Sequence, residues 1–170
     1  EYLRLLARCS LSSSSRSSNN NNPNLNLNPN PQPQPQPQPS NKPSPNIIMK
    51  AVKVTTPGPV DVLQVVDDFP VPQPREHDVV VDVKAIGVNP IDYKARDGMF
   101  GPKEVVGYDV AGIVSAVGSA VTRFKVGDEV YAAGDINRPG SYAEKTALDE
   151  RIVALKPKRL SFAEAAALPL

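Results

Sequence analysis

The chain has 170 residues and a formal net charge of +1, but its composition changes at Met49, before which nine of the 19 prolines lie. No stretch approaches the roughly 20 apolar residues of a membrane helix, and from Met49 onward 15 Lys and Arg stand against 17 Asp and Glu, which excludes a basic nucleic-acid surface. One cysteine, Cys9, and one histidine, His77, exclude an intramolecular disulfide and a zinc site built from Cys and His.

Residues 1–48 consist largely of Ser, Asn, Gln and Pro, and alternating Pro and Gln between Pro31 and Pro39 favour extended, polyproline-like conformations. We expect a disordered low-complexity tail. Its first part, Leu3–Ser18, is rich in Leu, Arg and Ser and nearly free of acids, which is typical of organelle transit peptides. The alternative is translated non-coding sequence ahead of a start at Met49.

From Met49 the pattern becomes that of β-strands. Polar and apolar residues alternate in Lys50–Val54, and Pro57-Gly58-Pro59 separates this run from a second one at Val62–Val66, which predicts a hairpin. The clearest strand is predicted at Asp78–Val88. Its residues on one face are apolar, so that face is expected to be core: Val79, Val81, Val83 and Ala85.

A short helix is predicted directly after this strand. Asn89 is able to cap it, and Pro90 suits the first helical position. Helical spacing allows this one segment to aim the Asn89 amide, the Tyr93 phenol and the Lys94 ammonium toward neighbouring space.

The rest of the chain predicts further short strands and one more helix. The strands are expected at Val110–Val117, Val130–Ala133, Ser141–Leu148 and Arg151–Leu155. Ser161 is placed to cap the final helix, with Glu164 completing a capping box. Many short strands between Gly and Pro turns predict a mainly β fold with short helices, either a small barrel or a sandwich.

Two motifs carry a resemblance to a known family. Gly107-Tyr108-Asp109-Val110-Ala111-Gly112 resembles the Gly-His-Glu-x-x-Gly block of medium-chain alcohol dehydrogenases with the zinc-binding His-Glu replaced. Asn89-Pro90-Ile91-Asp92 stands where zinc members carry Gly-x-Cys-x-x-Asp, with Asn89 in place of the cysteine. Three further matches follow in the family's order: Gly127-Asp128-Glu129-Val130, Gly140-Ser141-Tyr142-Ala143-Glu144 and Ala163–Pro169. The chain from Met49 onward therefore resembles the zinc-independent branch, the quinone oxidoreductases and the enone or alkenal reductases.

This resemblance implies a GroES-like barrel at residues 49–170 and an NADPH-dependent reduction of enones, alkenals or quinones without zinc. Asn-Pro-x-Asp-x-Lys, ending at Lys94, is closer to the enone reductases, since a tyrosine is expected at that position in quinone reductases. In the family the Rossmann domain follows the segment corresponding to Ala165–Pro169, and no Gly-x-Gly-x-x-Gly fingerprint occurs in the sequence. We therefore expect a fragment that lacks the Rossmann domain and is inactive alone.

The expected chemistry assigns roles to four side chains. Hydride delivery to an activated alkene leaves negative charge on the carbonyl oxygen, which a donor or a cation must stabilise. Lys94 is the first choice for the catalytic donor, and Asn89 with Lys94 for holding the cofactor, since an amide both donates and accepts. Tyr93 and Tyr108 are assigned to the substrate pocket. The alternatives are a solvated charge for Lys94, a helix cap for Asn89 and a purely structural carboxylate for Asp109.

The expected partners are a small carbonyl or quinone substrate and, in the full-length protein, a second copy in a homodimer, with neither nucleic acid nor membrane. The expected compartment is the cytoplasm, or a mitochondrion or plastid if the first residues are a transit peptide. A non-catalytic GroES-like scaffold remains the competing function. Zinc-dependent alcohol oxidation is set aside because the chain offers too few Cys and His ligands.

Overall fold

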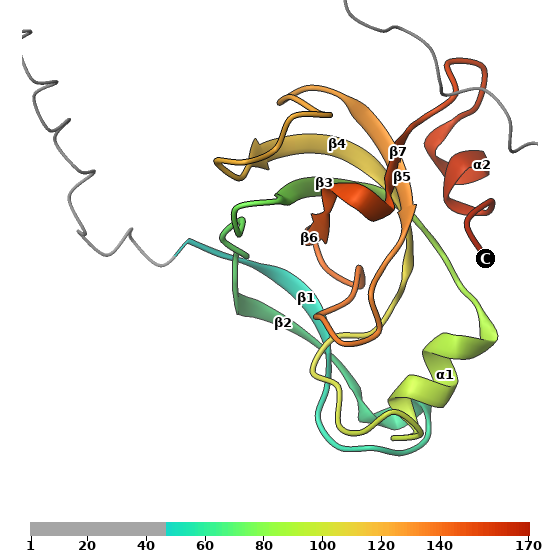
Figure 1. Cartoon of the computed structure of the whole chain (residues 1–170). Coiled ribbons are helices and arrows are strands. Elements are labelled where there is room, and N and C mark those ends of the chain that lie inside the picture. Colours follow the sequence, from blue (N-terminus) through green and yellow to red (C-terminus); the bar gives the residue numbers. More distant parts are fainter. Residues whose placement is uncertain (1–46) are drawn as a thin grey trace, which may run out of the picture. The chain divides into compact units, whose positions relative to one another are not determined.

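Strands dominate the part of the chain that the computed structural model describes, residues 47–170 (Figure 1). The predictions for residues 1–48, Cys9 included, lie almost wholly outside that range. The strands are β1 Ile48–Val54, β2 Leu63–Pro70, β3 Asp78–Gly87, β4 Asp109–Val117, β5 Glu129–Ala133, β6 Lys145–Asp149 and β7 Val153–Leu155. The α-helices are α1 Pro90–Arg96 and α2 Phe162–Ala166, and single 3-10 turns occupy Val60–Val62 and Glu150–Ile152. The predicted mainly β fold with short helices is confirmed.

The strands form two antiparallel sheets. β1 and β2 make a two-stranded sheet, and the larger sheet has the order β6-β3-β4-β5-β7. Bridges from Ala51 to Ala143 and from Lys53 to Val105 connect β1 to the segments that precede β6 and β4. The strands therefore continue from one sheet to the other around a shared interior, as in a barrel. Across residues 47–170, no helix has the length and apolar character needed to span a membrane.

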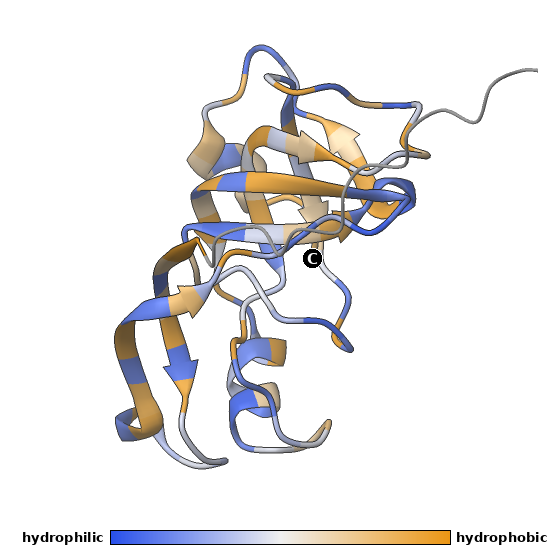
Figure 2. Cartoon of the chain, turned by 90° about the vertical axis from the view of Figure 1, so that its left-hand side faces the viewer, coloured by the Kyte–Doolittle hydropathy of each residue, from blue (hydrophilic) through white to orange (hydrophobic). Residues whose placement is uncertain are grey.

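Valine fills most of the main core, which lies inside the larger sheet. The strands of this sheet are largely apolar in Figure 2, and five of the core valines are at most 1% exposed: Val79 and Val81 on β3, Val110 and Val114 on β4, and Val130 on β5. β-Branched side chains pack well on a pleated sheet. Burial of each such side chain contributes about 1.5–3 kcal/mol relative to its exposure.

Two irregularities in the pairing of β3 with β4 divide the predicted core face of β3. The register shifts between Val80 and Val81 and again between Val83 and Ala85. Val83 still packs against the main core, whereas Ala85 packs in a second cluster, against α2. This second cluster is built on small residues, Ala111, Ala165 and Ala166, and α2 can therefore lie close against the sheet.

Residues 141–144 depart from the predicted strand Ser141–Leu148, because β6 begins only at Lys145. Their backbone groups bond to other segments. Ser141 N–H donates to Gly107 O at 2.8 Å, and Tyr142 O accepts from Val52 N–H at 2.7 Å. This stretch therefore closes the barrel between β1 and the segment before β4. The predicted capping box of α2 is confirmed, with Ser161 N–H donating to the Glu164 carboxylate at 2.8 Å.

A buried ion pair fixes the loop that leads into this stretch. Arg138 Nη1 lies 2.9 Å from Asp78 Oδ1, and Arg138 Nη2 lies 2.5 Å from Asp78 Oδ2. Asp78, the first residue of β3, is 2% exposed, and the hydrogen bonds from Arg138 lower the pKa of its carboxyl. This bidentate contact ties the loop after β5 to the start of β3.

We expect Arg138→Met to lower the free energy of unfolding by about 3–5 kcal/mol at pH 7, because it leaves a buried carboxylate without its partner. Since the pKa of Asp78 is lowered in the folded state, the ion pair stabilises the fold above the unfolded Asp pKa of about 3.9 and loses its effect as the pH falls further. Urea unfolding at pH 7 and pH 3 should show a smaller difference between wild type and variant at pH 3.

Arg151→Met is the matched control. Arg151 pairs with Asp149 at 2.7 Å, but 81% of its side chain is exposed, so its removal should leave stability nearly unchanged. If both variants lost the same free energy of unfolding, burial would not be what makes the Arg138–Asp78 ion pair stabilising.

Candidate active site

Asn89 occupies the turn between β3 and α1. Its backbone is extended, with φ −129° and ψ 161°, and it precedes the first helical residue, so the predicted N-cap position is confirmed. Asn89 N–H donates to the Asp92 carboxylate at 2.8 Å, and Asp92 N–H donates to Asn89 O at 3.0 Å. These two bonds satisfy backbone groups that a helix start leaves free.

The side chain of Asn89 makes a different contact, with Asp109 at the start of β4. Asn89 Nδ2 donates to Asp109 Oδ2. β3 and β4 pair Gly87 with Asp109, and Gly87 lies two residues before Asn89. A Cβ on Gly87 would lie 2.9 Å from Asp109 Cβ and 2.5 Å from Ala166 O. The absence of a side chain at Gly87 therefore leaves the space that Asp109 occupies.

Asn89 thus bridges two buried carboxyl groups, Asp92 through its backbone and Asp109 through its side chain. Asp92 is 4% exposed and Asp109 is 2% exposed. Burial raises the pKa of both, and the charge of Asp92 raises the pKa of Asp109 further, while the Asn89 hydrogen bond opposes that rise. Asp109, for which bonds to loop amides were expected, instead accepts a hydrogen bond from the side-chain amide of Asn89.

Tyr108 lies inside the fold. It is 4% exposed and packs with Val54, Ala95 and Val106. Burial, and then the charges of Asp92 and Asp135, raise the pKa of its phenol. Its hydroxyl has no hydrogen-bond partner within residues 47–170, and neither do Asp92 Oδ1 and Asp109 Oδ1. Tyr108 borders a small cavity of about 10 Å³, and its role in a substrate pocket stays a prediction.

Tyr142 completes this group, although the sequence did not single it out as a site residue. Its hydroxyl donates to Asp92 Oδ2 at 3.3 Å, and burial together with Asp92 raises the pKa of the phenol to about 12. Its ring lies over Gly107, which has φ +94°. The only signal in the sequence was the position of Tyr142 within a family motif, Gly140–Glu144.

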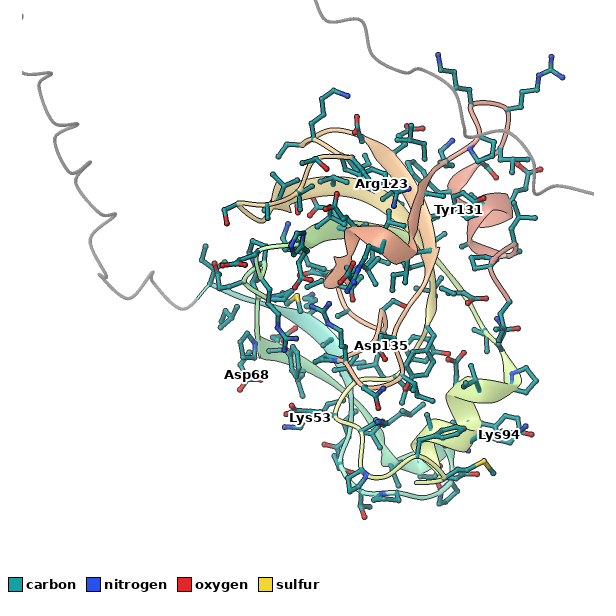
Figure 3. The ribbon with its side chains drawn as sticks, in the orientation of Figure 1. Lys53, Asp68, Lys94, Arg123, Tyr131 and Asp135 are labelled. Atoms are coloured by element: carbon teal, nitrogen blue, oxygen red, sulfur yellow. The ribbon has the colours of Figure 1, made fainter. Side chains whose placement is uncertain are left out.

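Lys94 and Tyr93 lie on α1, whose buried residues are Asp92 and Ala95. Figure 3 shows Lys94 on this helix. Tyr93 is 49% exposed, and Lys94 is partly exposed. None of the hydrogen bonds and ion pairs found among residues 47–170 uses the Lys94 ammonium. Met99 and Phe100, just beyond the helix, are 65% and 41% exposed. A cation and an aromatic ring therefore stand on one accessible segment.

A separate cleft of about 650 Å³ lies between the β1–β2 sheet and the end of β3. Its walls are mostly apolar, and Tyr142 borders it, but none of the four predicted site residues does. The structure thus brings Asn89 together with Asp92 and Asp109. Asn89, Tyr93, Lys94 and Tyr108 all lie outside this cleft. In the described part of the chain, no group of three or more His, Cys, Asp or Glu could hold a metal ion.

Comparison with known proteins gives a family match and close relatives. The alcohol dehydrogenase GroES-like domain matches residues 75–158. A 2-methylene-furan-3-one reductase from Solanum lycopersicum is 49% identical over 135 residues, which cover 72% of this chain and 34% of that protein. An NADPH-dependent alkenal/one oxidoreductase of Arabidopsis thaliana, named as chloroplastic, is 46% identical with the same coverage. A quinone oxidoreductase of Lama guanicoe is 38% identical and is covered to 37%. The chain thus spans about a third of the length of these relatives.

Solved structures agree with this match. A Rhizobium etli protein, provisionally named a zinc-dependent alcohol dehydrogenase, has a TM-score of 0.68 and 53% identity, with 73% of this chain and 37% of that one covered. A mycobacterial protein in complex with NADPH has a TM-score of 0.63 and 36% identity, with 69% and 37% covered.

We expect Gly107→Ala to destabilise the chain by about 2 kcal/mol or more. An added Cβ would lie 2.2 Å from Tyr142 Cδ1, and the residue already has a positive φ that side chains disfavour by about 1–2 kcal/mol. Displacement of the Tyr142 ring should also break its bond to Asp92. Urea unfolding followed by tyrosine fluorescence measures both effects, since the chain has no tryptophan.

Gly127→Ala provides the control, because Gly127 has φ +93° but nothing within 4 Å of an added Cβ. It should lose only the backbone contribution, about 1 kcal/mol. If the two variants lose the same stability, the close contact between Gly107 and Tyr142 does not exist.

Proposed function

Since this chain belongs to the medium-chain dehydrogenase/reductase family, we propose that residues 49–170 form the substrate-side domain of an NADPH-dependent oxidoreductase. The full-length protein reduces enones, alkenals or quinones by hydride transfer. The observation that carries this proposal is the Asn89 amide, which is anchored on a buried carboxylate at the start of the helix that presents Lys94. The names of the relatives support this class of substrate.

In this proposal Lys94 stabilises the negative charge that develops on the carbonyl oxygen. Its ammonium has no partner among the described residues, so it can turn toward a ligand at no cost in broken ion pairs. A charged donor acting in a site from which water is excluded has its largest effect on the transition state. Tyr93, on the same helix, would form part of the substrate pocket.

NADPH would supply the hydride, and Asn89 and Lys94 fit its nicotinamide end. An amide and an ammonium are suited to a carboxamide and a nearby carbonyl oxygen. The sequence has no Gly-x-Gly-x-x-Gly loop to cradle the pyrophosphate, so those contacts must come from a nucleotide-binding domain. One relative is named NADPH-dependent, and one similar structure contains NADPH.

The side chains at the positions of the family's zinc ligands do not fit zinc. Protein zinc sites draw on Cys, His and carboxylates. Here Asn89 and Tyr108 offer an amide and a phenol, and Asp109 is already bonded to Asn89. We therefore propose that turnover does not need zinc. The name of the Rhizobium etli structure points the other way, which makes a chelator the decisive reagent.

The proposed substrates, oligomeric state and compartment of the enzyme follow from the same family membership. It takes small carbonyl or quinone substrates and acts as a homodimer in the cytoplasm, or in a plastid or mitochondrion if residues 1–48 contain a transit peptide. One relative is named as chloroplastic.

We expect the full-length protein to oxidise NADPH in the presence of a short enone or a quinone, with and without a chelator. The rates are followed at the nicotinamide absorbance band. Activity that disappears with the chelator would refute the zinc-independent part of the proposal. No oxidation with either substrate would favour the alternative function, a scaffold without turnover.

We expect Lys94→Ala in the full-length protein to lower kcat about 100-fold, the usual effect of losing one donor to a developing oxyanion. Its stability should change little, because Lys94 makes no bond through its ammonium within residues 47–170. Steady-state kinetics and thermal unfolding measure the two effects. Lys158→Ala, at an exposed position before α2, is the control and should keep full activity.

A further inference from the structure

We propose that Tyr142 is a positioning residue for the reaction, because its hydroxyl holds the start of α1 in place and so sets the reach of Lys94. Tyr142 acts on Lys94 through the Asp92 carboxylate and the helix backbone. The part that concerns Lys94 rests on the proposed function, whereas the hold on α1 rests on the geometry of the site.

Tyr142 is held by both its backbone and its ring. Its N–H donates to Val106 O at 3.0 Å, and its carbonyl oxygen accepts from Val52 N–H at 2.7 Å. The ring packs in the same cluster as Ala95, a buried residue of α1, and an added Cβ on Gly107 would lie 2.2 Å from the ring. Because a tyrosine side chain turns about only two bonds, fixing the backbone and the ring also fixes the hydroxyl.

The Tyr142 hydroxyl reaches the carboxylate that closes the capping box of α1. Asp92 Oδ2 accepts from the Tyr142 hydroxyl at 3.3 Å and from Asn89 N–H at 2.8 Å. An ionised carboxylate only accepts, so the phenol is the donor. Within residues 47–170, no other side chain bonds to this carboxylate, and Asp92 Oδ1 has no partner. Tyr142 is therefore the side chain that ties the first turn of α1 to the stretch before β6.

The position of α1 depends on such contacts, because a helix of seven residues is not stable alone. Its far end bonds through Arg96 Nε to Gly58 O at 2.9 Å, and its near end bonds through Asp92 to Tyr142. Lys94 lies between these two contacts, and its ammonium takes part in no hydrogen bond or ion pair among the described residues. The helix therefore decides where the ammonium can reach, and a misplacement of about 1 Å can cost about 100-fold in rate.

The test is Tyr142→Phe in the full-length protein, which keeps the ring over Gly107 and removes only the bond to Asp92. We expect kcat to fall about tenfold. In a Lys94→Ala background the same change should alter kcat by less than about twofold, because two residues that act through one group are not additive. A general loss of stability would instead lower kcat in both backgrounds.

Hydrogen exchange measures the hold on α1 without any substrate. The amide hydrogens of α1 should exchange about fivefold faster in Tyr142→Phe, because one hydrogen bond fewer opposes local opening. Tyr131→Phe is the matched control, since no hydrogen bond among residues 47–170 uses the Tyr131 hydroxyl. Figure 3 shows Tyr131 at β5, well away from Lys94 on α1. The control should change neither kcat nor the exchange in α1.

Two results would overturn the positioning role of Tyr142. An unchanged kcat, or a loss of the same size in both backgrounds, would show that Tyr142 does not act through Lys94. Unchanged exchange in α1 would show that the hydroxyl does not hold the helix. If the wild type oxidises NADPH with neither an enone nor a quinone, the proposed function fails and the role of Lys94 with it, while the exchange still decides whether Tyr142 fixes α1.

Discussion

The candidate site depends on one residue that joins two buried carboxyl groups, Asn89 with Asp92 and Asp109. Buried carboxylates are costly unless hydrogen bonds satisfy them. Asn89 bonds to one oxygen of each, at the point where β3 leads into α1. The direction of that helix, and hence the place of Lys94, follows from this contact.

The rest of the fold serves to keep those carboxyl groups in position. The pairing of β3 with β4 sets Gly87 opposite Asp109, and the valine core holds that pairing in register. The irregular stretch before β6 brings Tyr142 over Gly107 and down to Asp92. The ion pair between Arg138 and Asp78 fixes the start of that stretch. The valine core, the stretch before β6 and the Arg138–Asp78 ion pair therefore all help to hold the carboxyl groups of Asp92 and Asp109 in position.

Local patterns in the sequence predicted the elements well. Runs of apolar residues, alternating with polar ones in several places, predicted the strands. Asn89-Pro90 and Ser161 correctly marked the starts of the two α-helices. The break at Val83 and Ala85 was not predictable, because a register shift depends on the partner strand and leaves no periodic signal. The same holds for Ser141–Glu144, where three distant backbone segments replace a single neighbouring strand.

The sequence marked some residues of the candidate site but none of their contacts. Asn89 and Asp109 were each recognised from motifs, but their bond joins residues 20 positions apart and arises only from sheet pairing. Tyr142 was overlooked because a tyrosine in a loop has no sequence pattern that distinguishes a buried hydroxyl from an exposed one.

The lack of a side chain at Gly87 has an evolutionary consequence. Any mutation that gives this position a side chain removes the room for Asp109, and any shortening of Asp109 leaves Asn89 without its anchor. Drift at one of the three positions is therefore harmful until the others follow. Among homologous genes these codons should therefore substitute together or not at all, because strand pairing joins Gly87 to Asp109 and a hydrogen bond joins Asp109 to Asn89.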